Sequence, residues 1–192
     1  EFLQRGYADI DSVPYVGGNA SQINQSINNG VSFVAYRGFG SPEDWAYPPY
    51  SIDNIEQVSN GRKLPVITSI VCGGGAFDSE TDPCFGEAWL RLGTGSNQKG
   101  AVGFIGPSEL DTKTRMNNTI IASMYQGVLH EEVSTLGGLL VRGKLGLYAN
   151  FPNNIDEFDA DANLSVPFYF NCYNLLGDPG LCFYVGPANS LT

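Results

Sequence analysis

Three short apolar, partly β-branched runs stand out along the chain, and each predicts a buried strand. They are residues 31–36, 64–72 and 101–105. Helical spacing of apolar residues predicts helices at 20–28, 85–92, 119–129 and 136–148. Gly30 follows the first of these as its predicted C-cap. Because strands and helices alternate, the pattern predicts parallel crossovers and an α/β sheet with helices on both faces.

The pattern changes towards the end of the chain. Residues 151–167 are polar and acidic, which predicts a loop. The aromatic run at 168–176 predicts a helix, and the apolar run at 181–185 predicts the last strand. We therefore expect one domain at 1–186 and a tail or linker at 187–192.

Composition narrows the class of protein. The 192 residues include 42% hydrophobic residues, enough for a folded core, and carry a formal net charge of -10. Such a charge repels phosphate groups, and no apolar run reaches the length of a membrane helix, so we expect neither nucleic acid binding nor membrane insertion. The acidic surface and four Asn-x-Ser/Thr sites (Asn19, Asn24, Asn117 and Asn163) favour a secreted or cell-surface location.

Candidate chemistry lies where two predicted strands run into glycine-rich turns. The first turn is Arg37-Gly38-Phe39-Gly40-Ser41 and the second is Cys72-Gly73-Gly74-Gly75. Ligands of parallel sheets bind at the carboxyl ends of strands, and glycine lets a substrate approach main-chain N–H groups there. Cys72 thus has the placement of a nucleophile, although a small buried apolar residue explains it equally well.

Four segments carry a family resemblance. They are residues 29–41, 68–87, 100–108 and the closing Gly-Asp motif at 173–179. In order and spacing they resemble the C-terminal half of a gingipain-type cysteine peptidase domain, family C25, over about residues 7–185. The family's corresponding first strand ends in Gly-His-Gly-Ser, which places Phe39 of this chain at the histidine position.

The resemblance implies a caspase-like three-layer α/β sandwich with a mostly parallel sheet. It also implies peptide cleavage by a cysteine thiolate, with a histidine that protonates the leaving amine. Carried over to this sequence, Cys72 is the nucleophile position, and the Gly40 and Cys72 N–H groups form the oxyanion hole.

Phe39 is the main departure from the family pattern, because a phenyl ring neither donates nor accepts a proton. We therefore expect a catalytically impaired domain that serves as a binding or structural module. The alternative is an active cysteine endopeptidase with Cys72 as nucleophile and a histidine from elsewhere. His130 is the only histidine of the chain, and its position near a predicted helix end favours a structural or solvent-exposed role.

No segment corresponds to the first half of the family's peptidase domain. The expected partner is a protein or peptide, with another chain or that missing half completing the sheet. A third hypothesis is a purely architectural surface or filament protein, which the acidic surface and the incomplete sheet also allow.

Three further features of the sequence allow more than one interpretation. Asp159, Asp161 and Asn163 have a spacing that can wrap calcium, but the glycine and glutamate of an EF-hand are absent. A solvated acidic loop is therefore favoured, and no other cofactor is expected. The aromatic and proline residues at 45–50 either line a groove or pack beneath a loop, and the four cysteines allow two disulfides, including Cys172–Cys182.

Overall fold

A four-stranded sheet forms the centre of the molecule, described here by a computed structural model for residues 1–7, 9–155 and 162–183. Its strands are β1 (Phe33–Arg37), β4 (Val66–Ile70), β5 (Gly103–Pro107) and β6 (Tyr173–Gly177). They lie in the order β1-β4-β5-β6. β1, β4 and β5 are parallel, while β6 runs antiparallel to β5. The predicted, mostly parallel sheet is confirmed.

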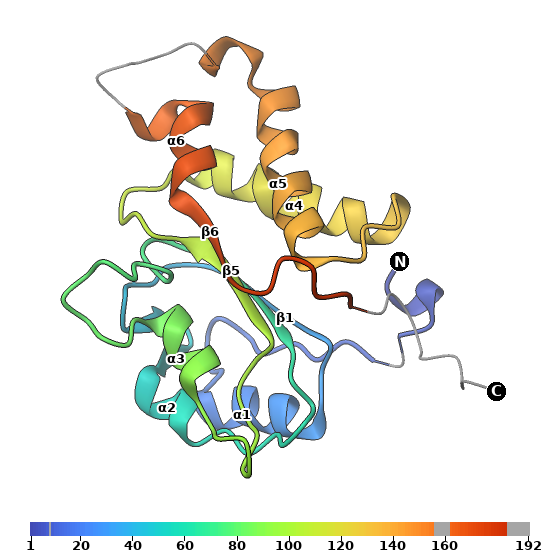
Figure 1. The fold of residues 1–192 in the computed structure, drawn as a ribbon, viewed down its shortest axis with the longest axis vertical. Helices are drawn as coiled ribbons and strands as arrows, with labels where there is room; N and C mark the ends of the chain where they lie inside the picture. Colours follow the sequence, from blue (N-terminus) through green and yellow to red (C-terminus); the bar gives the residue numbers. More distant parts are fainter. Residues whose placement is uncertain (8, 156–161, 184–192) are drawn as a thin grey trace.

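Helices cover both faces of this sheet (Figure 1). One group consists of α1 (Ala20–Asn29), α2 (Ile52–Glu56) and α3 (Phe85–Arg91). The other consists of α4 (Thr114–His130), α5 (Leu136–Asn150) and α6 (Val166–Cys172). A short hairpin of β2 (Asp44–Ala46) and β3 (Pro49–Ser51) follows β1, and single 3-10 turns lie at Leu3–Arg5, Pro152–Asn154 and Ala162–Leu164.

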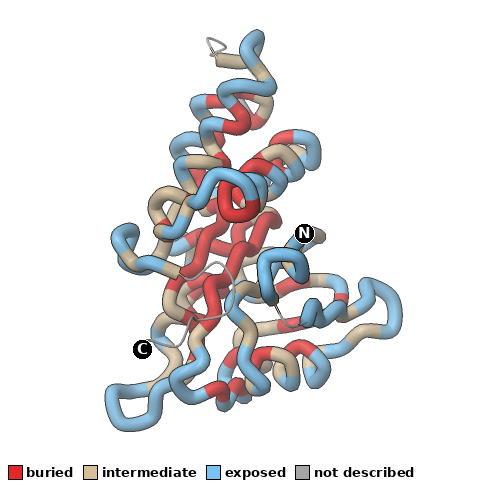
Figure 2. The backbone as a smooth tube through the Cα atoms, turned by 90° about the vertical axis from the view of Figure 1, so that its right-hand side faces the viewer, coloured by how far each residue is buried: buried red, intermediate tan, exposed pale blue. Residues whose placement is uncertain are grey.

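Two hydrophobic cores result from the alternation of side chains along the strands. Val66, Ile70 and Ile105 face α4, α5 and α6. Ile67, Val71 and Phe104 face α1, α2 and α3. Because both faces are covered, β4 and β5 are buried along their whole length, and the buried segments run through the middle of the molecule (Figure 2). The three layers expected from the sequence are therefore present.

Local signals set the ends of the predicted helices. Asn19 caps the start of α1, where its side chain accepts a hydrogen bond from the Gln22 N–H at 3.1 Å. Gly30 ends the same helix with φ 100°, a conformation that glycine adopts without strain. The predicted C-cap is confirmed.

The last predicted elements were partly wrong. Residues 168–176 do not form one helix, because α6 ends at Cys172 and the next residues pair with β5 as β6. The predicted last strand at 181–185 is reduced to a single bridge between Thr135 and Cys182 in the part that the structure describes. Residues 184 and 185, like the expected tail at 187–192, lie outside the described residues.

The aromatic and proline segment at 45–50 is mainly a packing unit. Trp45 and Tyr50 are buried in the core on the α1 side, and their rings stack at a centroid distance of 5.4 Å. Tyr47 is exposed. All four cysteines are free thiols, so the structure contains neither of the two disulfides that the sequence allowed.

Candidate functional site

The carboxyl ends of β1, β4 and β5 meet at one edge of the sheet because the three strands are parallel. The turn that carries Phe39 follows β1, and the turn that carries Cys72 follows β4. The loop from Ser108 to Lys113 follows β5 and leads into α4. The fold thus brings together three segments that are far apart in the sequence.

Cys72 is half-buried in this edge. Its Sγ atom lies 3.4 Å from the Thr112 hydroxyl oxygen and 3.9 Å from the Thr112 carbonyl oxygen. The glycines that follow fix the turn, since Gly73 N–H donates to Glu109 O and Gly75 N–H donates to Pro107 O, both at 2.9 Å. The cysteine therefore sits on a turn held by the loop after β5.

The Phe39 turn is held by hydrogen bonds to strand β1 and to the hairpin that follows it. The Phe39 carbonyl oxygen accepts hydrogen bonds from the Tyr36 hydroxyl at 3.0 Å and from the Ala46 N–H at 2.9 Å. The phenylalanine itself is 67% exposed. An exposed hydrocarbon ring thus occupies the strand end where the family resemblance placed a histidine.

Gly40 brings this turn against the Cys72 strand. A Cβ atom added to Gly40 would lie 2.7 Å from the Asp44 carbonyl oxygen and 2.7 Å from Val71 Cγ2. Val71 directly precedes Cys72, so the backbones of the two turns are neighbours. Within the described residues, neither the Gly40 N–H nor the Cys72 N–H donates a hydrogen bond to another protein group.

His130 does not belong to this edge. It is the last residue of α4, a helix that begins two residues after Thr112. With a rise of 1.5 Å per residue, the histidine lies about 24 Å along the helix axis from its start. Its Nε2 atom lies 3.2 Å from Glu1 Oε2, and its side chain is half-exposed. The geometry removes His130 as a partner of Cys72 and agrees with the expected role at a helix end.

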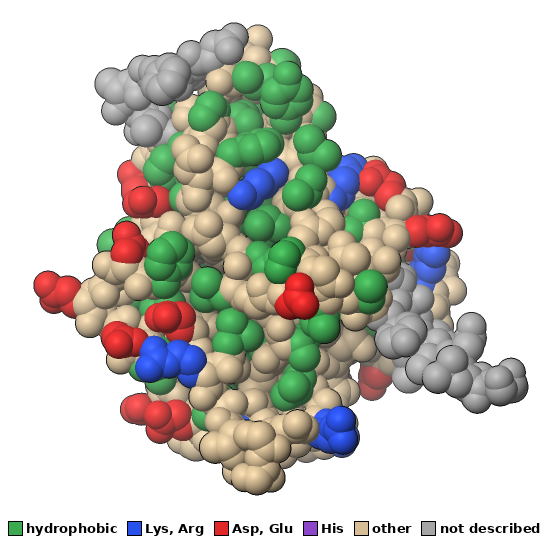
Figure 3. All heavy atoms as spheres, in the orientation of Figure 1, with side chains coloured by type: hydrophobic (Ala, Val, Ile, Leu, Met, Phe, Trp, Pro, Cys, Tyr) green, Lys and Arg blue, Asp and Glu red, His purple; other side chains and the backbone are tan. Residues whose placement is uncertain are grey.

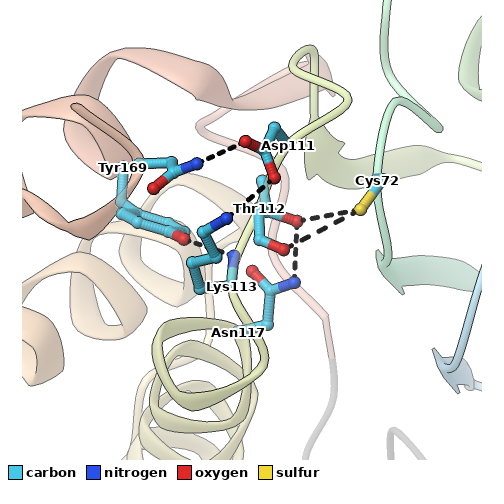
Figure 4. A network of polar contacts seen from close by, with 7 residues as sticks. Cys72, Asp111, Thr112, Lys113, Asn117 and Tyr169 are labelled. Carbon is cyan, nitrogen blue, oxygen red and sulfur yellow. Dashed lines mark hydrogen bonds and ion pairs between the residues drawn. The ribbon is translucent and has the colours of Figure 1, made fainter. Parts of the chain in front are cut away.

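Thr112 and Asn117 lie next to Cys72 (Figure 4) and belong to a buried polar network that continues to Tyr173. The Asn117 side-chain amide donates to the Thr112 hydroxyl at 2.8 Å, and its oxygen accepts from the Tyr173 hydroxyl at 2.6 Å. Burial raises the pKa of Tyr173 well above its usual value, so this hydroxyl keeps its proton. The sequence did not reveal the network. Asn117 stood out only as a glycosylation motif, yet it is 2% exposed and serves the interior.

The candidate calcium ligands are only partly placed. Asp159 and Asp161 lie outside the described residues. Asn163 is buried and donates a hydrogen bond from its amide to the Asp111 carboxylate. No group of three His, Cys, Asp or Glu residues suited to a metal ion occurs among residues 1–7, 9–155 and 162–183. The calcium hypothesis stays a prediction.

Comparison with known proteins places the chain in a family. Residues 2–184 match the model of "Peptidase family C25". The chain belongs to peptidase family C25. Gingipain R2 of Porphyromonas gingivalis is 24% identical over 185 residues, which cover 93% of this chain and 23% of the relative. Gingipain R1 of the same species is also 24% identical, and 17% of its length is covered.

Solved structures of this C25 family share the fold. The Arg-specific cysteine proteinase gingipain R superimposes with a TM-score of 0.80 at 24% identity, over 95% of this chain and 40% of the other. A complex of RgpB pro- and mature domains gives a TM-score of 0.83 at 21% identity, over 95% and 41%. The chain thus spans less than half the length of the relatives it matches, and it has the fold of one part of a gingipain-type domain.

Proposed function

We propose that this gingipain-type domain binds extended polypeptide at the carboxyl edge of its sheet and is impaired in cleaving it. The observation that carries the proposal is the exposed Phe39 ring at the position of the proton donor. Cleavage of an amide requires a proton for the departing amine, and a phenyl ring has none to give. Loss of one member of a catalytic pair lowers turnover by several orders of magnitude.

Binding has a main-chain component. The Gly40 and Cys72 amides are both unused within the described part of the chain, and their turns touch through Val71. Two N–H donors on contacting turns suit the carbonyl oxygen of a peptide, as they do in an oxyanion hole. The Phe39 ring beside them offers apolar contact area. A peptide backbone can thus dock without being cleaved.

Charge supports a basic partner. The segments that follow β1, β4 and β5 carry acidic residues that make no ion pair among the described residues: Glu43, Asp44, Asp78, Glu80 and Glu109. Acidic side chains gather on the left of the face in Figure 3, where Figure 1 places the loops after β4 and β5. They favour segments rich in Lys or Arg. Gingipain R, whose solved structure shares this fold, is an Arg-specific cysteine proteinase, which agrees with this choice.

A second chain, or a preceding half of the same domain, is also part of the proposal. No described strand pairs with the outer edge of β1, and an open edge is a ready site for strand addition. The solved complex of pro- and mature domains contains two polypeptide parts. A secreted or cell-surface location fits the acidic composition. No described helix has the length and hydropathy needed to span a membrane.

The competing function is an active cysteine endopeptidase. It is favoured by the presence of Cys72 beside two free amides. In that case the histidine comes from outside this chain, since His130 lies at the far end of α4.

A binding assay with product analysis separates the two functions. We expect fluorescent Lys- and Arg-containing peptides to bind with a measurable change in anisotropy and to be recovered intact by mass spectrometry. A neutral peptide of the same length serves as the control. Cleaved peptide that disappears with Cys72→Ala establishes the endopeptidase instead, and absence of any binding overturns the proposal.

A further inference from the structure

Three buried polar side chains lead from the core to the sulfur of Cys72. Tyr173 lies at the start of β6 and is fully buried, Asn117 lies in the first turn of α4, and Thr112 lies in the loop between β5 and α4. The exposed fractions of Asn117 and Thr112 are 2% and 9%. Buried polar groups cost free energy unless their hydrogen bonds are satisfied, so a chain of such groups needs a consistent direction.

The hydrogen bonds of this series run in one direction, which Tyr173 sets at the end that lies in the core. Tyr173 donates its hydroxyl proton to Asn117 Oδ1 at 2.6 Å, and a carbonyl oxygen can only accept. The amide nitrogen of Asn117 therefore faces Thr112 and donates to its hydroxyl oxygen at 2.8 Å. That hydroxyl still has its own proton, and the Cys72 sulfur lies 3.4 Å away. Either the hydroxyl or the thiol can donate in this contact, but once the sulfur is a thiolate only the Thr112 hydroxyl can be the donor.

No other side chain among the described residues makes a hydrogen bond with the Cys72 sulfur. Its other polar contact is the Thr112 carbonyl oxygen at 3.9 Å, which accepts from the thiol and has no proton to offer a thiolate. Phe39 supplies none either. Among the described residues, the Thr112 hydroxyl is therefore the side-chain donor within reach of the Cys72 sulfur.

We propose that Thr112 is a positioning residue for Cys72. Its hydroxyl, which Asn117 and Tyr173 orient, donates a hydrogen bond to the sulfur and so favours the thiolate form without a histidine. The inference rests on the proposed function only in placing Cys72 in the binding edge. Since the thiolate is the nucleophilic form, a donor at the sulfur increases its reaction with small electrophiles. Peptide hydrolysis is not required, because a thiolate alone does not protonate a leaving amine.

The test measures the rate at which iodoacetamide alkylates each cysteine, by mass spectrometry of the peptides over a range of pH. Cys182 is exposed and follows β6, which runs antiparallel to β5 and therefore ends away from the Cys72 turn. It serves as an internal reference. Cys84 and Cys172 are buried, and burial raises the pKa of both, that of Cys172 to about 12, so they react slowly. We expect Thr112→Val to slow alkylation of Cys72 by about threefold to tenfold near neutral pH, the size of one hydrogen bond.

The pH profile and two further variants separate positioning from loss of structure. We expect Thr112→Val to move the midpoint of the Cys72 profile to higher pH, and Thr112→Ser to restore it because the hydroxyl is kept. Thr68→Val is the matched control, since it removes another buried hydroxyl, bonded to Tyr125 at 2.8 Å, without touching the sulfur. An unchanged Cys72 profile in Thr112→Val overturns the inference, as does an equal shift in Thr68→Val or at Cys182. Failure of the proposed function shows separately, as Cys72-dependent peptide cleavage.

Discussion

Gly40 lies where the Phe39 turn packs against the strand that leads to Cys72. An added methyl group would meet the Asp44 carbonyl oxygen and Val71 Cγ2, both at 2.7 Å. Backbone atoms cannot move aside as a flexible side chain can. The residue is therefore glycine because the Phe39 turn packs directly against the strand that leads to Cys72.

The stability of a Gly40→Ala variant tests this packing. We expect the free energy of unfolding, measured by urea denaturation, to fall by about 1–3 kcal/mol, the usual cost of overpacking. Gly95→Ala is the control, because no heavy atom lies within 4 Å of its added Cβ. Equal stability of the two variants would mean that the turns are further apart than described.

At this scale the sequence predicted some residues of the site and missed others. The sequence singled out Cys72, Phe39 and Gly40 because glycine-rich turns follow predicted parallel strands, and the structure brings these turns together. Their roles at a site stay a prediction. Thr112 and Tyr173 were not found, since they bear no motif and reach the sulfur only through packing of the β5 loop and β6. Asn117 was noted only for its Asn-x-Ser/Thr motif, which carries no information on burial, and it is buried.

At the scale of elements, an ion pair fastens the end of α4 to α5. Arg142 donates from Nε to Glu131 Oε2 at 2.5 Å and from Nη2 to Glu131 Oε1 at 2.7 Å. These hydrogen bonds to the guanidinium lower the pKa of Glu131. Because the folded-state pKa is depressed, the contribution to stability is present above the unfolded-state value and is lost as the pH falls through the folded-state value.

Replacing the carboxylate should therefore have a pH-dependent effect. We expect Glu131→Gln to lower the melting temperature at neutral pH, and the difference from the wild type to vanish in acid, where Glu131 is protonated. Glu80→Gln, which removes an exposed carboxylate without an ion pair among the described residues, is the control. A difference that is constant from neutral to acid pH would contradict the role of the ion pair.

Element boundaries show where sequence patterns stop being sufficient. Helices α1 and α5 were predicted well because capping residues and apolar spacing agree locally. The run at 168–176 contains both α6 and β6, and its aromatic residues suit either structure. The division at Cys172 is set by pairing of the following residues with β5, a tertiary contact that no local signal records.

At the scale of the whole molecule, the alternation of strands and helices was enough to predict the layered α/β fold. Two observations support the proposal that another chain or domain half pairs with β1. The edge of β1 is open, and this chain covers about two fifths of gingipain R. The net charge of -10 attracts positively charged partners. Charge is a property of the whole surface, so its effect on binding depends on ionic strength.

Salt should weaken the binding of basic peptides. We expect the dissociation constant for a Lys- or Arg-rich peptide to rise as the salt concentration increases from about 0.05 M to about 0.5 M, since the Debye length shortens over this range. The anisotropy of a labelled peptide measures this. A neutral peptide of equal length should show little change, and an equal response of both peptides would exclude an electrostatic contribution.

Peptide turnover tests the central claim most directly. The rate of hydrolysis of Lys- and Arg-containing peptides is measured for the wild type and for Cys72→Ala under identical reducing conditions. The account predicts that the two rates are the same and no higher than that of the buffer, because Phe39 leaves the departing amine without a proton donor. Hydrolysis by the wild type that is lost in Cys72→Ala would contradict it.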